Sequence, residues 1–241
     1  MTNQVSTSHR LYESLGRVIA EARPGERLPS EPNLARRLGV SRATLREAMR
    51  TFETQGLIRR RQGVGTFVLR PAHVLESGLE VLESIETIAK RIELQVSLGE
   101  LTIERRGAKE TEATALSLPP DAQVIHVSRV ILAEERPVAY LIDILREGLI
   151  DLEEMQRDFT GSMLDLMIQR GDPPLVNSHC EINAVAANSD VARALNIQRG
   201  DALLCFSSRL YDINGIAVDY SISYFLPGYF RFHVVRELAK H

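Results

Sequence analysis

The sequence contains little cysteine, no tryptophan and no long hydrophobic run. Its 241 residues include only two cysteines, Cys180 and Cys205, which excludes a disulfide framework and a cysteine-rich zinc site. No segment approaches roughly 18 uninterrupted apolar residues, and the N-terminus carries no apolar signal-peptide core. We therefore expect a cytoplasmic protein with no membrane partner, and we expect both cysteines to be core residues.

Catalytic and metal-binding motifs are also missing. The sequence has no Gly-x-Ser-x-Gly, no Walker loop and no His-Glu-x-x-His, and its six histidines are dispersed without ligand spacing. We expect no catalytic residue, no metal site and no cofactor. An enzyme acting on a small metabolite is kept as a less favoured alternative, because a pocket with Ser162 and two aspartates could support acid–base chemistry.

The charge is divided unevenly along the chain. Residues 1–71 contain 13 Arg and 6 Glu with neither Lys nor Asp, a net charge of +7, whereas the other 170 residues carry a net charge of −10. The 44% hydrophobic content is enough for two globular domains. A basic head on an acidic body indicates a polyanionic partner for the head.

Three helices are predicted in the head. Apolar residues at helical spacing predict the first over residues 9–22. A second is expected to begin after Ser30, its N-cap, and to end at Gly39. Ser41 can cap a third, which ends at Gly56 and buries a stripe formed by Leu45, Ala48, Met49 and Phe52. The short turn between the last two is typical of a helix-turn-helix.

Residues that suit DNA binding follow this motif. The third helix places outward-facing side chains at its N-terminal turn, the end by which recognition helices enter the major groove: Arg42, Thr44 and Arg46. Residues 57–69 then predict a winged hairpin. Its arginines supply positive charge, and its glycines allow close approach to a sugar–phosphate backbone: Arg59, Arg60, Arg61, Gly63 and Gly65.

The run LPSEPNLARRLGVSRATLREAMRTFETQGLIRRRQGVGTFV, residues 28–68, resembles the GntR family of bacterial transcription regulators. The resemblance implies that double-stranded operator DNA is contacted by Ser41, Arg42, Thr44 and Arg46. It also implies that the wing tip at Gly65 enters the minor groove.

Residues 74–93 have an amphipathic pattern that predicts one helix of about twenty residues. We favour a linker helix packed on the body over a coiled-coil seam of a dimer.

The body repeats itself. The segment that starts at Leu101 matches the segment that starts at Cys180 at a separation of 79 and then 80 residues. Each copy is expected to form a strand, a short helix, a long strand, a tight turn and a long strand. Two such halves can share one antiparallel sheet about a pseudo-two-fold axis and leave a ligand cleft between them. Ser162 is the expected N-cap of a helix between the copies.

The pieces ALSLPPD, ERPVAY, FTGSMLDLM, ARALNIQRGD and AVDYSISYF, between about residues 75 and 238, resemble the UTRA effector-binding domain of the HutC branch of this family. The resemblance implies an α+β fold with a winged helix-turn-helix head at 1–71, a linker region at 72–99 and an effector-binding and dimerisation domain at 100–241. It also implies an effector site lined by Leu141, Ile142, Asp143, Ser162, Met163, Leu164, Asp219, Ser221 and Phe225.

The implied site departs from that of relatives that sense phosphorylated amino sugars. Such relatives often have an acid, two arginines and an aromatic residue where this chain has Leu141, Ile142, Ile222 and Leu164. Because a phosphate needs charge-assisted donors, a sugar phosphate is disfavoured. Asp143 and Asp219 remain to accept hydrogen bonds from hydroxyl or amine groups, so we expect an effector with an apolar part and such groups.

These observations together predict a homodimeric, effector-responsive, sequence-specific transcription regulator. Repression is the expected sign, because blocking polymerase needs only occupancy of the operator. A ligand-independent DNA-binding protein is the alternative, although a body of net charge −10 is poorly suited to coating DNA.

Overall fold

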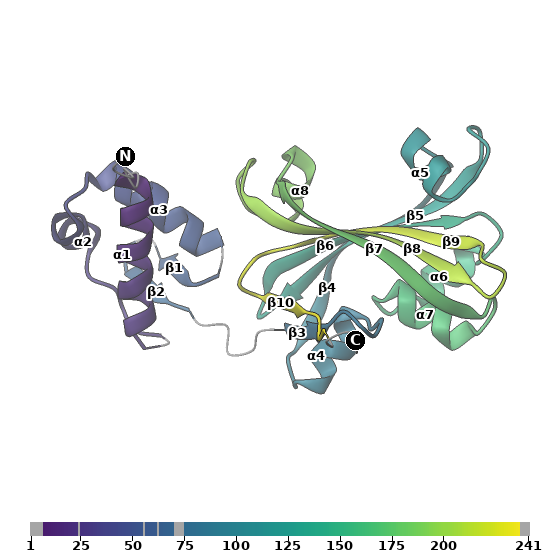
Figure 1. The fold of residues 1–241 in the computed structure, drawn as a ribbon, viewed down its shortest axis with the longest axis horizontal. Helices are drawn as coiled ribbons and strands as arrows, with labels where there is room; N and C mark the ends of the chain where they lie inside the picture. The colour runs from purple at the N-terminus through teal and green to yellow at the C-terminus, as the bar shows by residue number, and fades with distance from the viewer. Residues whose placement is uncertain (1–6, 24, 55, 62, 70–74, 237–241) are drawn as a thin grey trace, which may run out of the picture. The chain divides into compact units, whose positions relative to one another are not determined.

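The computed structural model describes residues 7–23, 25–54, 56–61, 63–69 and 75–236 (Figure 1). The chain divides into two compact units. One, the head, spans 1–74 with 226–229, and the other, the body, spans 75–225 with 230–241. Within the described residues, no helix is both long and apolar enough to cross a membrane.

The head is a winged helix-turn-helix, as predicted. It contains α1 (Thr7–Glu21), α2 (Glu31–Leu38), α3 (Arg42–Thr54), β1 (Ile58–Arg61) and β2 (Gly65–Val68). The two strands pair antiparallel, with Arg61 opposite Gly65. The predicted stripe of α3 packs against α1, α2 and both strands in one core, which includes Leu15, Leu34, Leu45, Met49, Phe52, Ile58 and Val68. Burial of that stripe leaves the opposite side of α3 exposed.

Local capping explains where the helices of the head begin and end. The Ser41 hydroxyl accepts the Thr44 N–H at 3.0 Å and caps α3. Gly39 ends α2 in the left-handed region, with φ of 66°. Ser30 occupies the N-cap position of α2, but its side chain makes no capping hydrogen bond, so that part of the prediction is wrong.

The body contains two similar halves, as the internal repeat predicts. The first half comprises β4 (Val96–Gly107), α5 (Glu110–Ala115), β5 (Gln123–Ala133) and β6 (Arg136–Arg146). The second comprises β7 (Leu175–Ala186), α8 (Ser189–Ala194), β8 (Ala202–Asp212) and β9 (Ala217–Phe225). The first three elements start at residues 96, 110 and 123 in one half and at 175, 189 and 202 in the other, a constant separation of 79.

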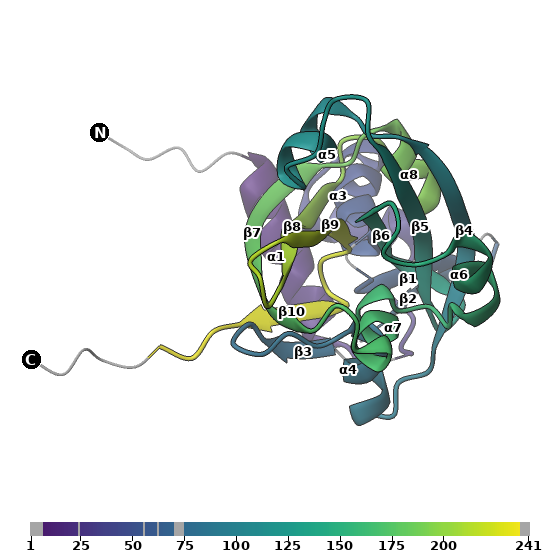
Figure 2. The same ribbon diagram turned by 90° about the vertical axis from the view of Figure 1, so that its right-hand side faces the viewer.

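The two halves form one antiparallel sheet with the strand order β4-β5-β6-β9-β8-β7. The last strands of the halves, β6 and β9, are neighbours at its centre. Figures 1 and 2 show α5 and α8 on one face and α6 (Leu152–Asp158) and α7 (Met163–Arg170) on the other. Side chains alternate between these faces, so Ile144 packs in the cluster with Leu116 after α5, while Leu145 packs against α6 and α7.

The segment after the head is not one long helix. It forms β3 (Leu75–Gly78), which pairs parallel with β10 (Phe230–His233), and then the short helix α4 (Ile85–Arg91). Ser84 caps α4 by accepting the Thr87 N–H at 2.9 Å. Pairing with a strand some 150 residues away overrides a helical pattern that Gly78 already weakens. The prediction of a helix over 74–93, as a linker or as a coiled coil, is therefore wrong.

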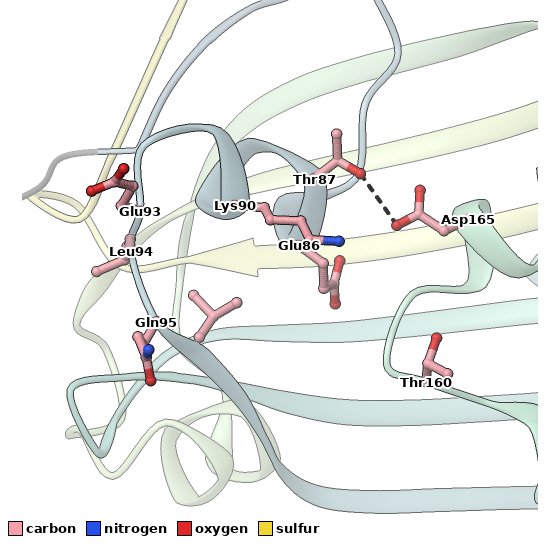
Figure 3. Close-up of a pocket in the computed structure, with 9 residues that line it drawn as sticks. Glu86, Thr87, Lys90, Glu93, Leu94, Gln95, Thr160 and Asp165 are labelled. Carbon is pink, nitrogen blue, oxygen red and sulfur yellow. Dashed lines mark hydrogen bonds between the residues drawn. The ribbon is translucent and has the colours of Figure 1, made fainter.

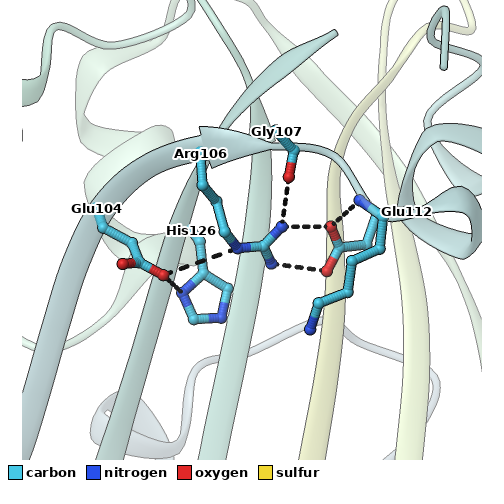
Figure 4. A network of polar contacts seen from close by, with 6 residues as sticks. Glu104, Arg106, Gly107, Glu112 and His126 are labelled. Atoms are coloured by element: carbon cyan, nitrogen blue, oxygen red, sulfur yellow. Dashed lines mark hydrogen bonds and ion pairs between the residues drawn. The ribbon is translucent and has the colours of Figure 1, made fainter. Parts of the chain in front are cut away.

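A polar network joins β4, β5 and the start of α5 (Figure 4). The Arg106 guanidinium donates to both carboxylate oxygens of Glu112 at 2.7 Å, and the Lys109 N–H donates to the same carboxylate at 2.8 Å. Burial alone would raise the pKa of Glu112, but these partners hold it below the usual value. His126 lies beside the network, and burial together with the Arg106 charge lowers its pKa.

His126 should make the stability of the body sensitive to acid. Its pKa is lowered on folding, so below about pH 6.5 the unfolded chain binds more protons than the folded one and stability falls. We expect wild type to lose up to about 1.4 kcal/mol per pH unit more than His126→Gln between pH 7.5 and 5.5, measured by urea unfolding. His179→Gln, at an exposed site, is the control, and equal losses in all three proteins would contradict the expectation.

Candidate DNA-binding surface and ligand cavity

The N-terminal turn of α3 presents two arginines to solvent. The side chains of Arg42 and Arg46 are 59% and 54% exposed. Glu31, at the start of α2, accepts a hydrogen bond from Arg46 at 2.7 Å and lies 4.0 Å from Arg42. Exposed ion pairs of this kind are weak, so both guanidinium groups remain available to a stronger anionic partner.

The wing carries the three predicted arginines on its first strand, all exposed. Arg60 donates to Glu53 at 2.6 Å, and Arg61 lies over the ring of Phe67, 5.5 Å from its centroid. Arg59 has no ion pair to another described residue. Contacts with Glu53 and Phe67 therefore hold Arg60 and Arg61 against the head, whereas Arg59 is exposed.

The wing tip depends on two glycines with positive φ, 71° at Gly63 and 138° at Gly65. A Cβ atom at Gly65 would lie 2.5 Å from Nε of Arg27, so a larger residue would displace that side chain, and the φ of 138° would strain it as well. Arg27 is exposed and bridges to Phe67 of β2. Sequence reasoning missed it, and the only signal was the general richness of the head in arginine.

The body contains a cavity of about 590 Å³ on the face of the sheet that carries α7. Its floor comes from the central strands and β7, including Leu141, Asp143, Cys180, Phe206, Ser208, Asp219, Ser221 and Phe225. The rest of its wall comes from β3, residues 79–84, α4, the start of α7 and β10, including Glu86, Ser162, Met163, Leu164 and Phe232. This volume is typical of a small-molecule site.

Three charged residues form a row across this floor. Arg129 lies opposite Leu141, two residues before Asp143, and Asp143 lies opposite Ser221, two residues after Asp219. The period of two therefore brings Arg129, Asp143 and Asp219 to one face on three adjacent strands. They are 5%, 7% and 5% exposed, and Arg129 forms an ion pair with Asp143.

Two carboxyl groups at the cavity, those of Asp219 and Glu86, are buried without enough hydrogen-bond donors and positive charge around them. Burial, and then the nearby charge of Asp143, raises the pKa of Asp219 well above its usual value. Burial also raises the pKa of Glu86, although the charge of Arg129 opposes this. Oδ1 of Asp219 and Oε1 of Glu86 are buried with no hydrogen-bond partner among the described residues. Each of these oxygens is open to a donor from outside the chain.

The helices above the cavity are tied together through Asp165 (Figure 3). Its carboxylate accepts from the hydroxyl groups of Ser84 at 2.7 Å and Thr87 at 3.4 Å. Its own N–H donates to Ser162, which caps α7 as predicted. A second hollow of about 540 Å³, drawn in Figure 3, shares Glu86 with the main cavity. Glu86 therefore lines both the cavity and the second hollow.

Two family models match the chain. One, described as "UTRA domain", covers residues 94–231, and the other, "Bacterial regulatory proteins, gntR family", covers residues 7–68. The chain belongs to the GntR family of bacterial regulatory proteins and carries a UTRA domain. This membership, with the winged helix-turn-helix, confirms a DNA-binding transcription regulator rather than an enzyme.

Named relatives and solved structures agree with this membership. The GntR-family chain is 29% identical over 218 residues to the histidine utilization repressor of Klebsiella aerogenes, covering 85% of this chain and 86% of that protein. It is 28% identical over 203 residues to the transcriptional repressor NagR of Bacillus subtilis (strain 168), covering 84% and 82%. Its fold is similar to that of PhnF from Mycobacterium smegmatis, with a TM-score of 0.63 at 21% identity over 95% of this chain and all of that one.

The cavity of the GntR-family regulator contains all but one of the predicted effector residues. Ile142 is the exception, because alternation along β6 turns its side chain to the opposite face, where it packs with Leu116 and Ile144. Placing Ile142 in the cavity is therefore wrong. Ile222 is also absent from the cavity wall. The lack of arginine at positions 142 and 222 therefore does not indicate whether the cavity can bind a phosphate.

Sequence reasoning missed Arg129, the buried cation of the cavity. Arg129 interrupts the largely apolar strand β5, and an arginine in a strand expected at the centre of a sheet was the available signal. The assignment of both cysteines to the core is also only half correct. Cys205 is buried, but Cys180 is exposed and lines the cavity. No group of three or more His, Cys, Asp or Glu side chains that could hold a metal occurs among the residues with described positions.

Proposed function

We propose that this regulator is a homodimeric repressor that a small metabolite releases from its operator. The observation that carries the proposal is the pairing of an exposed basic end of α3 with a separate cavity that holds unpartnered polar groups. Relatives named as utilization repressors support repression rather than activation. We also propose a cytoplasmic location, because operator DNA lies there.

The proposed division of labour follows the two units. Residues 1–71 read DNA, residues 100–241 bind the effector and dimerise, and residues 72–99 connect them. Within that connection, residues 77–84 supply part of the cavity wall, so a bound ligand would touch a segment that follows the head closely in the sequence. Ligand contacts there would alter how two heads are presented to two half-sites.

The proposed DNA contacts fall into two classes. Ser41, Arg42, Thr44 and Arg46 lie at the N-terminal turn of α3, which suits base edges and adjacent phosphates. The wing supplies phosphate contacts, because its arginines are exposed and its tip lacks Cβ atoms: Arg59, Arg60, Arg61, Gly63 and Gly65.

Replacing Arg46 by alanine should reduce operator affinity by about 1 to 3 kcal/mol and relax specificity at one base position. Arg59→Ala should instead weaken binding to all sequences alike and flatten the salt dependence. Both are measured by fluorescence anisotropy on operator and scrambled DNA. Arg193→Ala, which removes an exposed arginine from α8 in the body, is the control. Unchanged operator affinity for Arg46→Ala would remove that residue from the interface.

The regulatory proposal is tested by linkage. A thermal-shift screen of metabolites identifies ligands that bind the folded state, and each is then titrated with and without operator. A tenfold loss of DNA affinity corresponds to about 1.4 kcal/mol of coupling, and operator must weaken ligand binding by the same factor. Equal ligand affinities in the two titrations would contradict allosteric release, and insensitivity to every ligand would favour a ligand-independent DNA-binding protein.

A further inference from the structure

The cavity wall contains more negative than positive charge. Arg129 is its buried cation; it forms an ion pair with Asp143, and its Nε has no hydrogen-bond partner among the described residues. Asp219 and Glu86 are additional acids whose Oδ1 and Oε1 atoms are buried with no partner among the described residues. Leaving such an acceptor unsatisfied is costly. A ligand that supplies a donor to both would remove that cost.

The chemical preference follows from this charge balance. An anion entering the cavity would approach three carboxyl groups, those of Asp143, Asp219 and Glu86, and the single cation Arg129, whose charge is shared with Asp143. At the edge of the cavity, Glu83 is paired with Arg91 at 2.8 Å, and Glu80 adds a further acid. A phosphate or carboxylate is therefore disfavoured, whereas a cation gains charge-assisted hydrogen bonds.

We propose that the cavity binds a small molecule through a protonated nitrogen held by the carboxylates of Asp219 and Glu86. This inference rests on the proposed function, because it names the chemical class of the effector. The rest of the ligand is apolar. Phe206, Phe225 and Phe232 line the cavity with ring centroids 4.5 to 5.1 Å apart, and such a cluster suits a hydrocarbon or aromatic body.

Binding should release protons. The pKa of Asp219 and that of Glu86 are raised by burial, with Asp143 and Asp165 adding to the effect and Arg129 opposing it. A bound cation favours the ionised carboxylates and lowers both pKa values. Affinity should therefore increase with pH across the range in which these carboxyl groups titrate. A ligand amine with a pKa near about 10 stays protonated there.

The test uses full-length protein and matched probes. Butylamine, hexylamine and 2-phenylethylamine are compared by isothermal titration calorimetry with the alcohols and carboxylates of the same skeletons. We expect each amine to bind about tenfold to a hundredfold more tightly than its alcohol and the carboxylates to bind more weakly still. Titrations in buffers of different ionisation enthalpy should show proton release with the amines.

Variants identify the carboxylates responsible. Asp219→Asn and Glu86→Gln should each reduce the preference for amine over alcohol by about tenfold and reduce the number of protons released. Both remove a buried charge, and Asp219→Asn should raise the melting temperature, increasingly so as pH rises, because the raised pKa makes ionised Asp219 destabilising. Asp190→Asn, whose side chain is 81% exposed on α8, is the matched control and should bind like wild type.

The outcomes separate the ligand class from the regulatory function. Equal affinity for amine and alcohol, tighter binding of a carboxylate, or no amine binding at millimolar concentration would each overturn the ligand class. Operator release by a neutral or anionic metabolite would also overturn it, while supporting the regulatory proposal. Amine binding that depends on Asp219 but leaves operator affinity unchanged would support the ligand class and contradict the effector role.

Discussion

A fragment that ends at residue 69 will bind operator DNA roughly a hundredfold to ten-thousandfold more weakly than the full chain. Each chain has one α3 and one wing, and a single reading head contacts only one half-site. In the proposed dimer, binding of the first head raises the effective concentration of the second at its half-site. The fragment keeps its own apolar core, so its fold can be checked by circular dichroism before anisotropy measurements.

Two controls make this result specific to dimerisation. Sedimentation of the full chain should give a dimer, and an operator with one half-site scrambled should reduce its affinity towards that of the fragment. A full chain that sediments as a monomer both free and on DNA would contradict the proposed dimer. Equal affinity of fragment and full chain would contradict it as well.

Arg129→Ala will lower the free energy of unfolding of the body by roughly 3 to 5 kcal/mol. The substitution removes the buried partner of Asp143 and the cation whose charge lowers the pKa of Asp219 and Glu86. The loss should be larger at pH 8 than at pH 5. Carboxyl groups with raised pKa values bind protons more tightly when folded, so their cost increases as pH rises towards those values. Urea unfolding at the two pH values measures both effects.

A double variant distinguishes the broken ion pair from simple loss of volume. Arg129→Met combined with Asp143→Leu replaces both partners with apolar side chains and should recover most of the stability lost by Arg129→Ala. Arg193→Ala removes an exposed arginine of α8 and should change stability by less than about 0.5 kcal/mol. A loss of that small size for Arg129→Ala would show that the buried ion pair contributes little.

The parts of the fold that sequence reasoning predicted correctly depend on local or repeated signals. Ser41 caps the first turn of α3, and Gly39 ends the last turn of α2, so both signals are local. The 79-residue separation of the two halves can be found by comparing the sequence with itself. The error over 74–93 has a different cause. The partner of β3 is β10, and nothing near β3 in the sequence specifies a pairing across so many residues.

The same distinction applies to the cavity. The resemblance identified the strands that carry it, but Ile142 was included because a continuous run was carried over without the alternation of a strand. Arg129 was missed because its importance depends on Asp143, which becomes its neighbour only through the register of β5 and β6. Charge compensation is a property of side chains from several strands together.

The parallel pairing of β3 with β10 has a consequence for synthesis on the ribosome. The apolar core of the head lies within residues 11–68 and can fold as it emerges, since domains generally fold as units from the N-terminus. The cavity cannot be completed then, because Phe232 in its wall and the strand partner of Leu75 are translated only some 150 residues after Leu75. A nascent or prematurely terminated chain would therefore carry a folded DNA-reading head before, or without, the means to sense a metabolite.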